Sequence, residues 1–279
     1  MSNSDGWGKH AGAYRSNTKS GPPRDSVRAI LAKIDSLLPF EEATSILDNG
    51  CGTGIGIEVL IEEYSDRFLN LPRIVAADLS PGMVEAVKQT KTSNESSKLW
   101  KKVEFGVWSV DDMSAVSDNS FSHIIASLVM FFSSKPEAAF KEAYRVLAPN
   151  GVIGMTSFKE NEWMKLLNVA KKVRTDAKEA PGLPATWASE GWIRTSFEKA
   201  RFRDIEVKEL NVHVELNETR PFAEFCVRSD NPVMSSVFEN FTEQEKDLAV
   251  HLIIDHLDEK YPQRPAKMPG VLLVSSARK

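Results

Sequence analysis

The chain has only two cysteines among its 279 residues, and it has no hydrophobic run of the length that crosses a membrane. A small secreted scaffold held by disulfides needs more cysteines, so we expect Cys51 and Cys226 to be free thiols in a reducing compartment. The first twenty residues also lack an apolar stretch of signal-peptide length. These absences predict a cytoplasmic protein with no membrane partner.

An excess of positive charge is lacking too, because 35 Lys and Arg stand against 39 Asp and Glu, a formal net charge of −4. Proteins that bind nucleic acid through its phosphates usually carry a basic surface. We therefore expect no nucleic-acid partner. The 42% of hydrophobic and 27% of charged residues are ordinary for a soluble globular enzyme.

Short apolar runs alternate with helix-like segments over the first 160 residues. Buried-type strands are predicted at 45–47, 73–77, 103–107, 121–127 and 152–157, with a turn at 148–151. This alternation is typical of a mostly parallel sheet with helices on both faces. With two later strands at 205–210 and 271–276, the pattern predicts a Rossmann-like α/β fold with seven strands.

Residues 1–24 are rich in Gly, Ser, Asn and Pro, and they predict a flexible N-terminal arm or lid. A helix is expected from Asp25, with Asp25 or Ser26 as its N-cap. Residues 25–279 are expected to form one domain, in which 217–262 make a helical insertion that is part of a substrate cap. The apolar insertion leaves both a monomer and a homodimer open.

The segment Asp48-Asn49-Gly50-Cys51-Gly52-Thr53-Gly54 lies between the first strand and the next helix. Glycines there allow a positive φ and let a ligand approach the main chain, while the helix start offers free N–H groups. A tight turn without a ligand is the alternative, but alternating glycines after an acid favour a binding loop. The dinucleotide spacing G-x-G-x-x-G fails from every start, and no Walker A lysine is present.

A second acid, Asp78, ends the second strand, where a carboxylate can accept hydrogen bonds from both hydroxyls of a ribose. Its alternative role as a helix cap falls to Ser80, which is followed by Pro81. Leu79 and Met83 are then expected to bound an adenine ring.

Three segments together resemble the class I methyltransferases of small molecules over roughly residues 40–160. They are Ile46-Leu47-Asp48-Asn49-Gly50-Cys51-Gly52-Thr53-Gly54, Ala77-Asp78-Leu79-Ser80-Pro81-Gly82-Met83 and Tyr144-Arg145-Val146-Leu147-Ala148-Pro149-Asn150-Gly151. Together with these motifs, Phe202-Arg203-Asp204 is similar to the fungal secondary-metabolism branch, which includes the thiol methyltransferases of epidithiodioxopiperazine pathways.

The resemblance implies S-adenosylmethionine as the methyl donor. By motif matching, Asp48 and the loop of Gly50, Cys51, Gly52 and Gly54 face its methionine part, Asp78 its ribose, and Ser109 with Val110 its adenine. Many members carry an acid where this chain has Ser109, so the adenine acceptor is either Ser109 or Asp111. Ser127 is expected near the sulfonium and the methyl acceptor, and Tyr14 of the arm joins the cofactor site.

The fourth strand runs into an apolar segment, Ser127-Leu128-Val129-Met130-Phe131-Phe132, which suits a small organic acceptor and not a flipped base. The expected acceptor-binding residues, whose alternative role is ordinary packing, are Trp7, Met130, Phe131, Phe132 and Trp163. Holding the acceptor atom (S, N or O) in line with the methyl group is the main task, and a thiol with a pKa near ~8.5 needs little help from a base. His10 is the one weak candidate for that base, and no metal ligands are assigned.

Two other classes remain open from the residues alone. One is a non-catalytic methyltransferase-like protein that regulates a partner, because an intact cofactor loop does not prove turnover. The other is a nicotinamide-dependent oxidoreductase, against which the glycine spacing argues.

Overall fold

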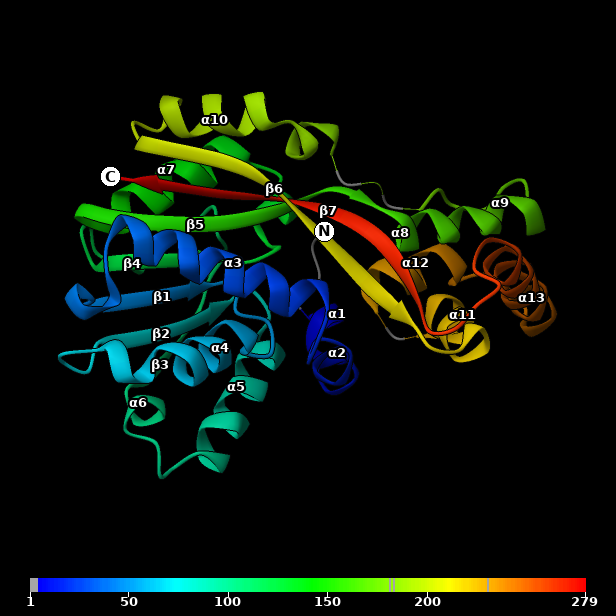
Figure 1. Cartoon of the computed structure of the whole chain (residues 1–279), viewed down its shortest axis with the longest axis horizontal. Coiled ribbons are helices and arrows are strands. Elements are labelled where there is room, and N and C mark those ends of the chain that lie inside the picture. The colour runs from blue at the N-terminus through cyan, green and yellow to red at the C-terminus, as the bar shows by residue number, and fades with distance from the viewer. Residues whose placement is uncertain (1–4, 181, 183, 230) are drawn as a thin grey trace.

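The computed structural model describes residues 5–180, 182, 184–229 and 231–279, and its centre is one seven-stranded sheet in the order β3-β2-β1-β4-β5-β7-β6 (Figure 1). The strands are β1 (Ser45–Asn49), β2 (Arg73–Asp78), β3 (Val103–Val107), β4 (Phe121–Ala126), β5 (Leu147–Asn161), β6 (Arg203–Leu216) and β7 (Ala266–Arg278). β1 to β5 pair in parallel, whereas β7 is antiparallel to β5 and to β6. The predicted mostly parallel sheet is therefore confirmed.

Helices cover both faces of this sheet (Figure 1). One face carries α3 (Pro22–Leu37), α4 (Ile55–Tyr64) and α5 (Pro81–Ser93), and the other carries α7 (Pro136–Val146) and α10 (Glu190–Lys199). Successive strand residues supply the two layers in turn, because side chains alternate along a strand. Ile125 belongs to the buried cluster of α3 and α4, and its neighbour Ile124 belongs to the cluster of α7 and α10.

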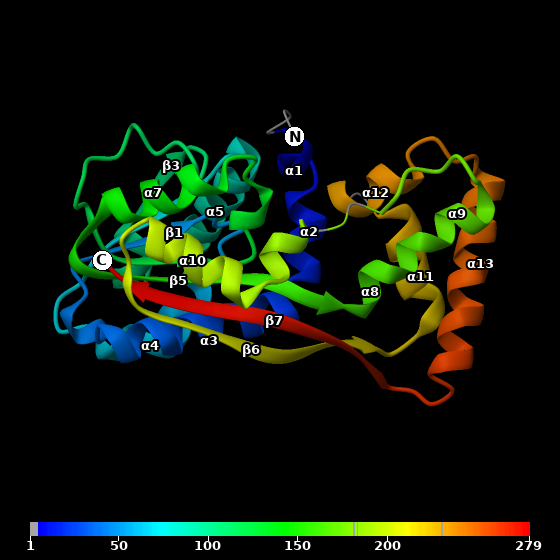
Figure 2. The same cartoon turned by 90° about the horizontal axis from the view of Figure 1, so that it is seen from above.

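The strands β5, β6 and β7 are longer than the sequence predicted, and they run out of the α/β core (Figures 1 and 2). Their far ends carry α8 (Glu162–Lys165), α9 (Ala170–Val173), α11 (Thr219–Arg228), α12 (Pro232–Phe238) and α13 (Glu243–Lys260), which we call the helical lobe. A buried cluster of its own, which includes Leu167, Phe238 and Ile253, holds the lobe together. The predicted insertion at 217–262 is helical as expected.

The turn predicted at 148–151 is not a separate turn, because these residues lie within β5. The pairing of β5 with β4 shifts register between Phe121 and His123, and Asn150 has a φ of 66°. The Pro-Asn-Gly signal therefore makes an irregularity inside a strand instead of ending it.

The start of α3 corrects another prediction, since neither Asp25 nor Ser26 caps this helix. Gly21 is the N-cap and Pro22 is the first helical residue, a position where the fixed φ of proline fits a helix. Ser26 lies inside the helix and is fully buried.

Residues 5–17, within the predicted arm, form the short helices α1 (Asp5–Gly8) and α2 (Ala11–Asn17), while residues 1–4 of that arm lie outside the described residues. α1 crosses the start of α5, where a Cβ on Gly82 would lie 2.5 Å from the Cα of Gly8. Two backbones meet this closely only where neither carries a side chain. Both views place α1 and α2 between the α/β core and the helical lobe (Figures 1 and 2).

No helix in the described part of the chain combines the length and the hydrophobicity that a membrane span requires.

Gly82→Ala should loosen the docking of α1 on α5, because the added methyl group would overlap the main chain of Gly8. We expect faster hydrogen exchange of the amides in 7–17 and a loss of about 1–3 kcal/mol in unfolding free energy. Gly6→Ala is the matched control, because a Cβ at Gly6 meets no atom within 4 Å. Equal exchange in both variants would contradict the close glycine contact.

Candidate functional site

The glycine loop between β1 and α4 is held against the end of β2. The N–H groups of Gly50 and Cys51 both donate to the carbonyl of Ala77, at 2.7 and 2.9 Å. Gly50, Gly52 and Gly54 have φ values of 80°, 51° and 97°, a region that favours glycine over other residues. The loop therefore forms because of its glycines, and it exposes main chain where side chains would block a ligand.

Asp48 is the last residue but one of β1 and lies beneath this loop, with only 2% of its surface exposed. Its Oδ2 atom has no hydrogen-bond partner, and a side chain at position 56 would overlap the carboxylate, so Gly56 is required there. Burial and the nearby charge of Asp78 raise the pKa of Asp48 to about 7, although a backbone hydrogen bond from Ile57 opposes this. An orphaned buried acceptor of this kind calls for a donor from a ligand.

Asp78 ends β2 and receives two main-chain hydrogen bonds, from the N–H groups of Gly52 and Ser80, each at 2.9 Å. Burial raises its pKa even so. Ser80 caps α5 through the N–H of Met83 at 3.2 Å, which confirms the predicted cap. No described Lys or Arg forms an ion pair with Asp48 or Asp78, and this pair of acids therefore favours a cationic ligand.

The segment after β3 presents the residues expected to read adenine. Ser109 donates to one oxygen of Asp111 and Ser133 donates to the other, each at 2.6 Å. Burial opposes ionisation of Asp111, but these two hydrogen bonds and the charge of Lys135 lower its pKa overall. Ser109 and Asp111, the two alternatives for the adenine acceptor, thus act as one bonded unit. Val110 between them is buried.

Leu79 and Met83, the expected adenine neighbours, differ in exposure. Leu79 is 50% exposed and Met83 only 2%. Trp108, which the sequence analysis did not single out, contacts the last residue of β1. Its indole N–H donates to the side-chain oxygen of Asn49 at 3.3 Å, and the ring folds over Gly106, where a Cβ would overlap it. The sequence signal for this contact was the large ring of Trp108 two residues after Gly106, a glycine within a predicted strand.

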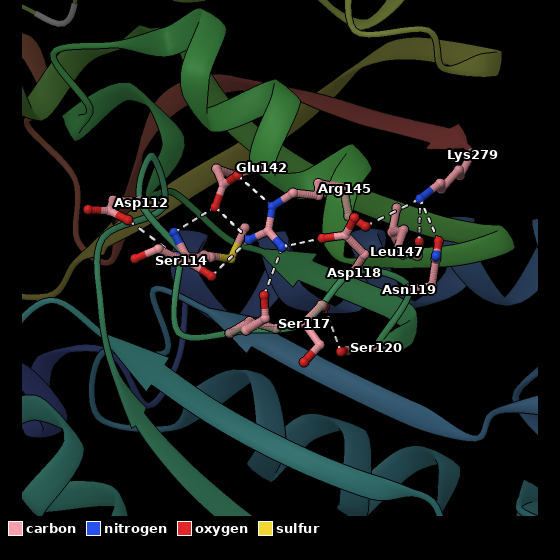
Figure 3. A network of polar contacts seen from close by, with 12 residues as sticks. Asp112, Ser114, Ser117, Asp118, Asn119, Ser120, Glu142, Arg145, Leu147 and Lys279 are labelled. Atoms are coloured by element: carbon pink, nitrogen blue, oxygen red, sulfur yellow. Dashed lines mark hydrogen bonds and ion pairs between the residues drawn. The ribbon is translucent and has the colours of Figure 1, made fainter.

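Arg145, whose role the sequence left unassigned, anchors the chain between Asp111 and β4 to α7 (Figure 3). Its guanidinium donates to the carbonyls of Met113 and Val116, both at 2.8 Å, and to the carboxylate of Glu142 at 2.7 Å. Glu142 in turn accepts from the N–H of Met113 at 2.8 Å. This clamp gives a structural reason for the Tyr-Arg-Val-Leu motif.

The end of β4 carries a chain of buried hydroxyls. The Oγ of Ser26 lies 2.7 Å from the Oγ of Ser127 and 2.7 Å from the Oγ1 of Thr156, and the N–H of Leu128 donates to Thr156 at 3.0 Å. Leu128 has a φ of 52°, an unfavourable conformation for a residue with a side chain. Its side chain packs against the clusters of both the α/β core and the helical lobe.

A series of aromatic rings runs from the arm to the helical lobe, and it brings together four of the five predicted acceptor-binding residues. The centroid distances are 5.7 Å for Tyr14–Trp7, 5.7 Å for Trp7–Phe132, 4.7 Å for Phe132–Phe131, 6.2 Å for Phe131–Phe158 and 5.9 Å for Phe158–Trp163. The fifth, Met130, is buried beside Phe131, while Phe132 remains 41% exposed. Phe158 was missed because it lies one residue past the strand predicted at 152–157, in the part of β5 that the sequence analysis did not assign.

The arm closes directly on the glycine loop. The ring of Tyr14 lies 3.5 Å from the position of a Cβ on Gly52, and its pKa rises to about 12 through burial and the charge of Asp78. Arg15 donates to the carbonyl of Thr53 at 2.9 Å and forms an ion pair with Glu58 of α4. The arm residue Tyr14 therefore lies where the sequence expected a cofactor contact.

The histidines differ in position. His123 is fully buried between the hydroxyl of Ser122 and the carbonyl of Leu38, each at 2.9 Å, and burial lowers its pKa to about 4. This neutral side chain is structural. His10 is the N-cap of α2, and its main-chain N–H donates to the carbonyl of Trp7 at 3.1 Å. Cys51 is buried, which raises its pKa well above the usual range and keeps the thiol neutral.

Asp48→Asn should stabilise the protein in a pH-dependent way. A carboxyl whose folded pKa is about 7 costs stability as pH rises from its unfolded pKa near ~3.9 through 7, and the variant avoids this cost. The difference in unfolding free energy should grow between pH 4 and pH 7, to at most about 4 kcal/mol, and stay constant above pH 8. Chemical denaturation at several pH values measures it, with the exposed Asp66→Asn as control. A difference independent of pH would contradict a raised pKa.

Comparison with known proteins agrees with this geometry. Residues 47–155 match the family model described as methyltransferase domain. Methyltransferase ucsB of Acremonium sp is 28% identical over 253 residues, which cover 90% of this chain and 87% of that protein. Acetylaranotin bis-thiomethyltransferase of Aspergillus terreus is 23% identical over 228 residues, which cover 77% and 75%.

Among solved structures, phosphoethanolamine N-methyltransferase 2 of Haemonchus contortus, in complex with phosphomonomethylethanolamine and S-adenosylhomocysteine, superposes with a TM-score of 0.52 at 19% identity. The match covers 91% of this chain and 52% of that one, so this chain spans about half of its length. At this identity the likeness shows a shared fold.

Proposed function

We propose that this chain, which belongs to the class I S-adenosylmethionine-dependent methyltransferases, methylates a small organic molecule of secondary metabolism at a sulfur, nitrogen or oxygen atom. The observation that carries the proposal is the glycine loop at one end of a series of aromatic rings. It is flanked by the buried Asp48 and the half-buried Asp78, and no described Lys or Arg forms an ion pair with either. The acids suit a positively charged cofactor, and the rings suit an apolar acceptor.

The residues present fit S-adenosylmethionine. The orphaned Oδ2 of Asp48 is an acceptor for its ammonium group, and each oxygen of Asp78 keeps a lone pair for a ribose hydroxyl. The cofactor supplies an activated methyl group on a cationic sulfur. Ser109, Asp111 and Val110 are the residues for its adenine ring, and Tyr14 covers the loop.

Orientation is the main contribution of the protein to catalysis, because the methyl group is already activated. A reaction of this kind gains roughly 7–11 kcal/mol from correct placement of the reactants in favourable cases. The rings of Trp7, Phe131 and Phe132 supply flat apolar walls, and docking of the arm excludes water from the glycine loop. We assign no general base, and His10 of the arm remains the weak candidate for an acceptor that keeps its proton.

A sulfur acceptor receives specific support from one relative, whose name describes a thiomethyltransferase. A thiol forms some nucleophilic thiolate near neutral pH, so its methylation does not require a general base, and none is assigned in this site. We place a thiol first, before an amine or a phenol, in the search for the acceptor.

Methyl transfer from labelled S-adenosylmethionine to a panel of thiols, amines and phenols tests the proposal. Gly52→Arg should abolish transfer, because the long side chain would fill the loop at a φ of 51° and meet the ring of Tyr14. Gly191→Arg on α10 is the matched control, because a Cβ there meets only the hydroxyl of Ser189 at 4.0 Å. Transfer that survives Gly52→Arg would place the cofactor elsewhere.

Phe132→Ala should raise the KM for the acceptor about 2–10-fold, because a well-placed aromatic contact is worth about 0.5–1.5 kcal/mol. Its 41% exposure predicts little loss of stability, and the affinity for S-adenosylhomocysteine should stay unchanged. Steady-state kinetics with the acceptor found in the panel measure the effect. Leu69→Ala, at a position 77% exposed, is the control. An unchanged KM would remove Phe132 from the acceptor site.

A further inference from the structure

The hydroxyls of Thr156, Ser26 and Ser127 form a chain at the end of β4, and their available partners determine which hydroxyl donates to which. Thr156 and Ser26 are both fully buried, so each of their protons needs an acceptor within the protein. Thr156 Oγ1 accepts from the N–H of Leu128, and its remaining partner among the described residues is the Oγ of Ser26. If Ser26 donated to Thr156, the Thr156 proton would be buried without an acceptor. Thr156 therefore donates to Ser26.

The same argument applies at the next link. The proton of Ser26 has one remaining acceptor in the described residues, the Oγ of Ser127 at 2.7 Å. Ser127 therefore accepts from Ser26, and its own proton is left to point away from the chain. Ser127 is only partly buried, so this proton can reach a ligand. Aligned hydrogen bonds polarise one another, which makes the last hydroxyl a stronger donor.

The position of Ser127 selects the kind of ligand. Asp48 of β1 and Ile125 of β4 are register partners in parallel strands, so their side chains point to the same face, the one that α3 covers. Ser127, just after β4, reaches the same face, because it is hydrogen-bonded to Ser26 of α3. This end of the sheet thus offers an unpartnered acceptor at Asp48 Oδ2 and a free donor at Ser127. The first suits a cationic group and the second an anionic oxygen, as an α-amino acid requires.

We propose that Ser127 donates a hydrogen bond to the carboxylate at the amino-acid end of the cofactor, and that Ser26 and Thr156 are positioning residues that orient this donor. The inference rests on the proposed function. It assigns a role in cofactor binding to α3 and β5, through Ser26 and Thr156. The sequence motifs do not point to either residue. It also explains why Leu128 keeps its unfavourable φ, since its N–H starts the chain.

Calorimetric titration with two ligands separates this role from a general one. S-adenosylhomocysteine carries the carboxylate, and 5′-methylthioadenosine lacks the whole amino-acid end. Ser127→Ala, Ser26→Ala and Thr156→Val should each lower the affinity for S-adenosylhomocysteine roughly 10–100-fold, the usual effect of losing a hydrogen bond to a charged group. Their affinity for 5′-methylthioadenosine should match that of the wild type. Thr156→Ser keeps the hydroxyl and should bind both ligands like the wild type.

The double variant Ser127→Ala with Ser26→Ala should bind no more weakly than Ser127→Ala alone, because Ser26 acts through Ser127. Ser26→Ala carries the test if Thr156→Val fails to fold. Equal weakening of both ligands, or an unchanged affinity for S-adenosylhomocysteine in the variants, would overturn the inference alone. An increase in acceptor KM without a change in either affinity would overturn it too, since the donor would then face the acceptor. Wild-type protein that binds neither ligand would overturn the proposed function itself.

Discussion

Asp48 and Asp78 lie at the ends of neighbouring parallel strands, and the sheet therefore brings two carboxylates to one edge beneath a loop of exposed main chain. Asp48 is buried and Asp78 is half-buried, and no described cationic side chain pairs with them, so their charge is costly in the free protein. A folded protein keeps such an unfavourable arrangement where the binding of a ligand compensates for it. The left-handed glycines, the close contact with Tyr14 and the cap at Ser80 all serve to hold this pair of acids in place.

The proposed acceptor side depends on parts of the chain that lie far apart in sequence. The arm contributes Trp7, the segment after β4 contributes Phe131 and Phe132, and the start of the helical lobe contributes Trp163. Leu128 packs against the clusters of both the core and the lobe, so the strained residue after β4 lies where the two meet. A change in the lobe can thus reach the proposed acceptor wall without touching the glycine loop.

Local patterns were enough to predict the parallel half of the sheet. β3 has the predicted bounds of 103–107, because a short apolar run between polar segments has few alternative readings. The long antiparallel ribbon of β6 and β7 extends past its predicted ends. Leu210, Val212, Val214 and Leu216 alternate with polar residues, so a strand signal was present beyond residue 210 and the prediction missed it. The helices of the arm were missed because their stability comes from docking, through a contact between Gly8 and Gly82 that composition does not reveal.

The candidate site also contains some residues that the sequence predicts and others that only tertiary contacts reveal. The glycine loop and Asp78 follow from sequence spacing, since both lie at the ends of predicted strands. Ser26 could not be found in this way, because a serine near a helix start predicts a cap, and only the packing of α3 on the sheet brings it to Ser127. Trp108 and Arg145 likewise depend on tertiary contacts with Asn49 and with the chain before β4.

Calorimetric titration of the wild-type protein with S-adenosylhomocysteine, with NAD as the control ligand, tests the cofactor assignment most directly. We expect saturable binding of S-adenosylhomocysteine at one site and no binding of NAD, because the loop lacks the dinucleotide spacing and its two acids favour a cationic ligand. Binding of NAD without binding of S-adenosylhomocysteine would contradict the assignment.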